Sequence, residues 1–192
     1  LLTGTALVAG TLRYGWHPLQ SAVSDDIPAG AAVWRLAGIV GYLAISLLVN
    51  WGPERAPVRR TLAAEAIELA TVSGDRQGAL WAHVVRFLDA FSEGETDKAD
   101  AELEAYEQIA GQGRRPYYRW YLLVLRSTRL GFSGDLETAG RNVDEAFALI
   151  RGLEEDSGQE YAVQRLMLAR LRGSPADAPA DELRAFAERY PQ

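Results

Sequence analysis

The sequence predicts an all-α protein, arranged as a right-handed α-solenoid of stacked antiparallel helix pairs with about 40 residues per repeat. Three observations predict this fold. Apolar residues recur at spacings of three and four along most of the chain, which is typical of helices that bury one face. The same pattern returns about 40 residues later. No stretch combines strand-like alternation with hairpin turn signals, so strands are not expected.

Three columns of residues carry the repeat. Their members are Ala63, Leu103, Val143 and Leu183, then Ala66, Tyr106, Ala146 and Phe186, then Ala70, Ala110, Ile150 and Tyr190. The columns are three and four residues apart, so each repeat places its three members on one helix face. A fourth column is aromatic and consists of Trp81, Tyr121 and Tyr161. No copy buries both of its faces alone, so the copies are expected to stack.

Apart from the long loop 13–30, the predicted helices follow one another with short connections. They span 1–12, 31–50, 57–73, 76–92, 96–111, 116–133, 136–152, 158–172 and 178–190. Pro57, Pro116 and Pro179 stand where helices begin, a position in which the missing N–H does no harm. Gly94 and Gly134 stand one repeat apart in turns, where glycine suits the left-handed conformation that ends a helix.

The domain organisation follows from these elements. Residues 1–30 are expected to form an irregular N-terminal helix and loop, and residues 31–192 the repeat domain. The repeats cover roughly 31–73, 76–111, 116–152 and 158–190. The run 31–49 is apolar enough to prompt a membrane interpretation. Arg35 inside it and the lack of a basic cluster after it favour a helix buried among other helices.

The composition limits the possible partners. With 20 Lys and Arg against 26 Asp and Glu, the net charge is −6. Direct nucleic-acid contact is not expected, because phosphate binding needs clustered positive charge, and binding to an anionic membrane is disfavoured for the same reason. Cysteine is absent, which excludes disulfides and thiol chemistry and fits a cytoplasmic location.

The small-residue columns and the Gly-Asp turn resemble tetratricopeptide-like (TPR-like) repeats, although the spacing exceeds the usual 34 residues or so. A narrower resemblance covers roughly residues 45–190. The phrases LLVNWGPERAPVRRTLAAEAIELATVSGD, ADAELEAYEQIA and RPYYRWYLLVLRSTRLGFSGDLETAGRNVDEAFALI are similar to the repeat region of large bacterial regulators. These are actinobacterial LuxR-type transcription factors, SARP-type relatives and nucleotide-cyclase-like proteins with an ATPase switch domain.

The resemblance implies that any activity of a parent protein lies in adjacent domains of the same polypeptide. No G-x-x-x-x-G-K-[ST] phosphate loop occurs in the chain, so no nucleotide cofactor is expected. His17 and His83 are far apart and lack metal-ligand spacing, so no metal is expected either. No residue constellation suggests catalysis. The chain is therefore not expected to be an enzyme.

The candidate binding residues lie around the start of the helix 116–133. They are Arg114, Arg115, Tyr118 and Arg119, in a cluster that also holds Tyr117, Trp120 and Tyr121. Aromatic residues and arginine are enriched at binding hot spots. The competing interpretation is that the rings only pack against neighbouring helices, and for Tyr121, in the aromatic column, we prefer it. The acidic residues between 93 and 107 are expected to form a solvated helix face.

Two hypotheses about function follow. The first is a non-catalytic sensor module of a larger transcriptional or signalling regulator that binds a protein or peptide partner or a small-molecule inducer. The alternative is a structural spacer or oligomerisation arm with no ligand of its own. A surface with outward Tyr and Arg side chains would favour the first, and uniformly polar exposure would favour the second.

Overall fold

The described part of the chain is helical throughout. The computed structural model describes residues 29–49, 52–111, 116–151 and 157–174, together with Asp181 and Arg184. Within these ranges every element is a helix, seven of them α-helices, which confirms the all-α prediction. The chain divides into two compact units, Leu1–Ile109 and Ala110–Gln192.

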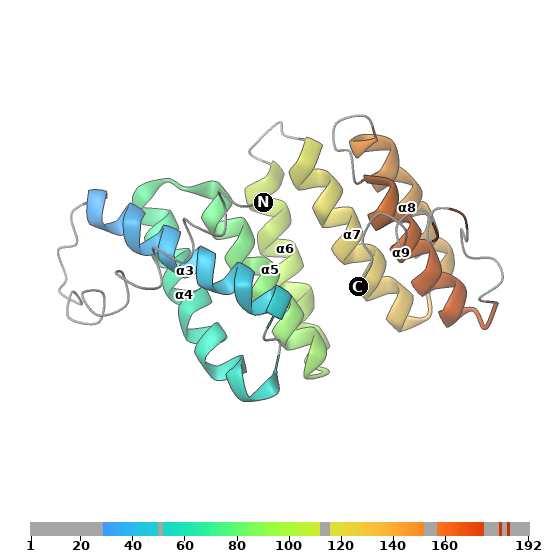
Figure 1. Cartoon of the computed structure of the whole chain (residues 1–192), viewed down its shortest axis with the longest axis horizontal. Coiled ribbons are helices and arrows are strands. Elements are labelled where there is room, and N and C mark those ends of the chain that lie inside the picture. The colour runs from blue at the N-terminus through green and yellow to red at the C-terminus, as the bar shows by residue number, and fades with distance from the viewer. Residues whose placement is uncertain are drawn as a thin grey trace. The chain divides into compact units, whose positions relative to one another are not determined.

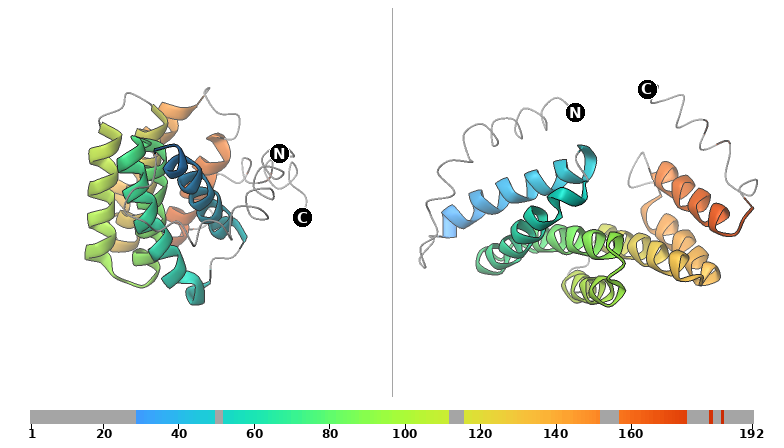
Figure 2. Two further views of the ribbon diagram at one scale, coloured as in Figure 1. Left: turned by 90° about the vertical axis from the view of Figure 1, so that its left-hand side faces the viewer. Right: turned by 90° about the horizontal axis from the view of Figure 1, so that it is seen from below.

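Unit 1 is a group of consecutive helices joined by short turns (Figure 1). Its helices are α3 (Ala29–Val49), the 3-10 turn η1 (Pro53–Arg55), α4 (Ala56–Ser73), α5 (Arg76–Ser92) and α6 (Thr96–Gly111), whose last two residues lie past the unit boundary. Helix α3 packs against both α4 and α5, and α4 packs against α5. Figure 2 shows α3 alongside α4 from two further sides. Helices α3, α4 and α5 therefore all contact one another.

The described residues of unit 2 form three helices that pack in a similar way. They are α7 (Pro116–Ser133), α8 (Leu136–Ile150) and α9 (Ser157–Leu171). Helix α8 packs against α7 and α9, and α7 also contacts α9 (Figures 1 and 2). A buried hydrogen bond joins α7 to α8, because the Ser127 hydroxyl donates to the carbonyl oxygen of Ala139 at 3.0 Å.

Helix boundaries follow the local signals in the sequence. Every described α-helix begins and ends within two residues of its predicted range, which is the usual uncertainty of such boundaries. The turn glycines Gly94, Gly134 and Gly173 have φ values of 76°, 94° and 74°. Glycine has no Cβ, so it adopts this left-handed backbone conformation without strain. This explains why each of these three turns contains a glycine. The predicted helices 1–12 and 178–190 and the predicted loop 13–30 lie outside the described residues, apart from the start of α3 and positions 181 and 184.

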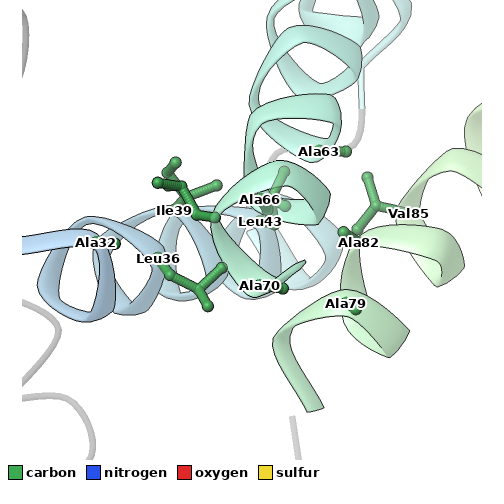
Figure 3. Close-up of a cluster of buried hydrophobic side chains, with 11 residues drawn as sticks. Ala32, Leu36, Ile39, Leu43, Ala63, Ala66, Ala70, Ala79, Ala82 and Val85 are labelled. Carbon is green, nitrogen blue, oxygen red and sulfur yellow. The ribbon is translucent and has the colours of Figure 1, made fainter. Parts of the chain in front are cut away.

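The core of unit 1 is built from small side chains that allow close helix packing. Figure 3 shows Leu36, Ile39 and Leu43 of α3 beside the alanines of α4 and α5. Ala63, Ala66 and Ala70, the first members of the three repeat columns, are all buried. The second and third members, Leu103, Tyr106, Ala110, Val143, Ala146 and Ile150, are buried as well. In the three copies that the structure describes, these column positions face the core as predicted, whereas Leu183, Phe186 and Tyr190 lie outside the described residues.

A buried ion pair ties α4 to α5. The side chains of Arg59 and Asp89 are each only 1% exposed. Nη2 of Arg59 donates to Oδ1 of Asp89 at 2.6 Å. Nε of Arg59 lies 3.1 and 3.2 Å from the two carboxylate oxygens of Asp89. Nη1 also donates to the carbonyl oxygen of Gly52 at 3.1 Å. Because the guanidinium contacts both carboxylate oxygens, its charge and its N–H donors are compensated, and it can be buried in the core.

The acidic stretch of α6 differs from its prediction at one position. Asp97, Glu104 and Glu107 are exposed, as expected of a solvated face. Glu102 is instead buried, with Oε2 2.7 Å from Nδ1 of His83 and Oε1 2.7 Å from Nη2 of Arg86. The prediction was wrong for Glu102 because its position on α6 faces α5, where these two partners compensate its burial.

The start of α8 makes the stability of unit 2 sensitive to acid. Asp135 caps this helix, since Oδ1 accepts the backbone N–H of Thr138 at 3.1 Å. That bond, the Thr138 hydroxyl and nearby Arg141 hold the pKa of Asp135 below its ordinary value of 3.8. A lowered pKa in the folded state contributes stability that is present above pH 3.8 and is lost as the pH falls through the folded-state pKa.

We therefore expect Asp135→Asn, which keeps the capping oxygen and removes the titration, to reduce the acid-induced loss of stability below pH 3.8. The measurement is urea unfolding at a series of pH values. Glu137→Gln removes a carboxylate from the same helix turn without touching the cap, and it corrects for net charge. An acid dependence in Asp135→Asn equal to that of the Glu137→Gln control would contradict this assignment.

Candidate binding site on α7, α8 and α9

The first turns of α7 gather aromatic rings on one side of the helix. Tyr117, Trp120 and Tyr121 are three and four residues apart, so they share a face. The ring centroid of Tyr117 lies 5.1 Å from that of Trp120 and 6.4 Å from that of Tyr121. The rings of Tyr117 and Tyr118 pack edge to face, with their centroids 6.2 Å apart. The packing interpretation therefore accounts for Tyr117, Trp120 and Tyr121.

The predicted site residues have different placements. Arg114 and Arg115 lie outside the described residues. Tyr118 is half-buried at the edge of the ring cluster, and Arg119 is exposed and forms an ion pair with Glu145 of α8. The structure thus brings Tyr118 and Arg119 to the same end of α7, with Arg119 held toward α8.

A small hollow opens where α7, α8 and α9 meet, and we call it the α7–α9 hollow. It is lined by Trp120, Val124, Val143, Ala146, Phe147, Tyr161 and Gln164. About 220 Å³ of empty space lies within it, including space open to solvent. Ligand pockets for drug-sized molecules occupy roughly 300–1,000 Å³. The α7–α9 hollow is therefore too small to enclose such a ligand, and what it offers a partner is its apolar lining.

Two residues that line the hollow, Phe147 and Tyr161, are held by contacts within unit 2, and Tyr161 also contacts charged side chains beside the hollow. The rings of Phe147 and Tyr161 are stacked with centroids 4.5 Å apart. The Tyr161 hydroxyl donates to Oδ1 of Asp144 at 3.2 Å, and the Arg165 guanidinium lies 5.8 Å from the centre of the Tyr161 ring. Apolar surface next to polar and charged groups is common at protein interfaces.

One polar atom in the wall is unsatisfied. The side-chain oxygen of Gln164 is buried and has no hydrogen-bond partner in the described structure. A buried acceptor without a donor costs free energy, so native structures pair nearly all of them. A partner that brings an N–H or O–H group into the hollow would remove that cost.

The lining residues supply binding groups and not reactive ones. Rings, methyl groups and an amide can bury a side chain and orient it by one hydrogen bond. Across the described residues, no group of three or more His, Asp or Glu side chains is arranged to hold a metal ion. No described helix is long and apolar enough to cross a membrane.

Sequence reasoning found only part of this hollow. Trp120 belonged to the predicted aromatic-basic cluster, and Tyr161 belonged to the aromatic column. Phe147 and Gln164 were not predicted. The sequence of one helix does not show which of its half-buried residues face the α7–α9 hollow, because the hollow forms only where three helices pack together. The alignment by repeat could have drawn attention to position 147, where a phenylalanine stands beside the buried column residue Ala146.

The chain was also compared with known proteins. No protein-family model, curated protein or solved structure matches it. The geometry of the two helical units and of the α7–α9 hollow is therefore the basis for the function proposed below.

Proposed function

We propose that the chain is a non-catalytic, TPR-like repeat module whose α7–α9 hollow binds a side chain of a protein or peptide partner. The packing within each unit supports a solenoid of stacked helix pairs. In unit 1, α3 contacts both α4 and α5, and in unit 2, α7 contacts both α8 and α9. Contact with the next helix and the next but one is what stacked helix pairs require.

The observation that carries the binding role is the hollow with its unsatisfied oxygen. Trp120, Phe147 and Tyr161 provide aromatic surface, which supplies much of the binding energy at interfaces. The buried oxygen of Gln164 provides a place for a donor from the partner. The small volume disfavours an enclosed metabolite, and the apolar lining favours contact with a side chain of a peptide.

The wider role rests on the resemblance to large bacterial regulators. In such a protein the module would lie in the cytoplasm, beside a switch domain of the same polypeptide. A partner that binds one arrangement of the helical repeats better than another would shift the equilibrium between them. That shift would reach the attached domain without any chemistry in this chain.

A displayed library of random peptides tests the binding role. We expect the full chain to select peptides of related sequence, and Phe147→Ala to weaken their binding at least tenfold, about 1.4 kcal/mol. Phe132→Ala is the matched control, because Phe132 is also in unit 2 but is 60% exposed and does not line the hollow. Circular dichroism would verify that both variants fold.

Two results would contradict the binding role. One is selection of no related peptides, and the other is equal loss of binding in Phe147→Ala and Phe132→Ala. Either result would favour a structural spacer. Replacement of the chain by an unrelated helical spacer of the same length would then leave the regulation of a parent protein intact.

A further inference from the structure

Two arginines that follow α9 along one face converge on α8, beside the α7–α9 hollow. Arg165 and Arg172 are seven residues apart, a spacing that places them on the same side of a helix. A Cβ on Gly140 of α8 would lie 3.4 Å from Nη2 of Arg172 and 3.7 Å from Nη1 of Arg165. The two guanidinium groups therefore lie close together over one residue of α8. We call Arg165 and Arg172 the arginine pair.

Contacts within unit 2 position both guanidinium groups and leave N–H donors unused in the described structure. Nη2 of Arg172 donates to the carbonyl oxygen of Leu136 at 3.0 Å, which occupies one of its five N–H donors. The guanidinium of Arg165 lies 5.8 Å from the centre of the Tyr161 ring. Oδ1 of Asp144 is 3.7 Å from Nη1 of Arg165, beyond hydrogen-bond distance. The arginine pair is thus held in place with donors available for a ligand.

The charges around the arginine pair favour a ligand with one negative charge. Asp144 offsets one of the two guanidinium charges, and the neighbouring Arg141 is paired with Glu137 at 2.5 Å. One positive charge of the pair is therefore not balanced by these neighbours. A single carboxylate would balance it, whereas a phosphate group, with a charge of roughly −1.5 to −2, would exceed it. Guanidinium groups also bind the two oxygens of a carboxylate by parallel N–H bonds.

We propose that the arginine pair binds the carboxylate of an acidic side chain in the peptide partner. This inference rests on the proposed binding role of the hollow, and it specifies the partner as an acidic peptide. The pair lies beside the hollow, because the Tyr161 ring lines the hollow and also contacts Arg165. A peptide that places an apolar side chain against the hollow can therefore reach the arginine pair with a nearby Asp or Glu.

Peptides that the full chain selects from a displayed random library test this proposal. We expect them to share an Asp or Glu at a constant spacing from an apolar residue. In a synthetic copy of one such peptide, replacement of the acidic residue by Asn or Gln should weaken binding about fivefold, near the upper limit for partly exposed ion pairs. The same replacement should weaken binding to Arg172→Gln by less than about twofold, because the arginine pair is then incomplete.

Arg141→Gln is the matched control for Arg172→Gln. It removes the same charge one residue from Gly140, but Arg141 already has a carboxylate partner in Glu137. Binding to this variant should keep the fivefold or so sensitivity to the acidic residue of the peptide. Circular dichroism verifies that both variants fold, and the replacement within the peptide leaves the chain itself unchanged.

Three results would overturn this proposal, and they have different consequences for the hollow. Related peptides without a shared acidic residue, whose binding still falls in Phe147→Ala, would remove the role of the arginine pair and leave that of the hollow intact. Equal sensitivity of Arg141→Gln and Arg172→Gln to the acidic residue would assign its effect to overall charge. Selection of no related peptides would contradict the binding role of the hollow, and this inference with it.

Discussion

Asp89→Ala is expected to lower the free energy of unfolding of unit 1 by about 3–5 kcal/mol. The substitution leaves the guanidinium of Arg59 in the core, 1% exposed, without the carboxylate that faces it at 2.6 Å. The carbonyl oxygen of Gly52 still accepts from Nη1 of Arg59, but a neutral acceptor does not replace the charge of the carboxylate, so much of the desolvation cost of the buried guanidinium is no longer offset. Urea unfolding of the full chain, followed by circular dichroism, measures the loss.

A neighbouring ion pair supplies the control for this prediction. Arg60 of α4 and Glu93, the residue after the end of α5, also form an ion pair at 2.5 Å, but their side chains are 46% and 35% exposed. Glu93→Ala is expected to cost at most about 1 kcal/mol, because solvent screens exposed pairs. A loss in Asp89→Ala no greater than in Glu93→Ala would mean that the Arg59 pair does not stabilise the core.

The paired replacement of both buried charges separates charge from packing. Arg59→Met combined with Asp89→Leu removes both ions and keeps apolar volume between α4 and α5. We expect this double variant to recover most of the stability that Asp89→Ala loses, since well-packed apolar residues often replace a buried ion pair without cost. A double variant as unstable as Asp89→Ala would assign the loss to packing.

Leu168→Ala is expected to destabilise unit 2 by about 2–5 kcal/mol. Leu168 is 1% exposed and packs in one cluster with Ala139 and Val143 of α8. Its Cδ2 also lies 3.3 Å from where a Cβ on Gly131 of α7 would be. This side chain therefore holds α9 to both other helices, and its truncation leaves a cavity among them.

Leu171→Ala on the same helix is the control for Leu168→Ala. Leu171 is 40% exposed, so its truncation is expected to cost less than about 1 kcal/mol. Hydrogen exchange adds a local measurement, because loss of docking should raise exchange in α9 before α7 and α8. Equal destabilisation by the two substitutions would contradict the assigned role of Leu168.

Local periodicity explains why the helices and their core faces were predictable. Burial of Ala63, Leu103 and Val143 follows from the positions they share within successive repeats. Apolar residues at helical spacing have few alternatives to a common buried face. The glycines and prolines at the turns and helix starts act through their own backbone preferences, so the sequence also predicts most helix ends.

Charged residues could not be assigned in the same way. Arg59 and Arg60 are adjacent and chemically identical, yet one is buried and the other exposed. The difference arises from the 100° or so between successive residues of a helix and from the position of Asp89, 30 residues later. Glu102 is the parallel case on α6, where His83 and Arg86 of α5 make its burial possible.

The candidate site shows the same division. The aromatic start of α7 was evident from the sequence, whereas Phe147 and Gln164 became part of the α7–α9 hollow only through packing of three helices. The sequence by itself determined the all-α class, the helix boundaries and the core-facing columns, because these depend on local spacing and backbone preference. Only the tertiary structure decided which charges are buried in pairs and which half-buried side chains meet in a hollow, because those outcomes depend on contacts between residues far apart in the chain.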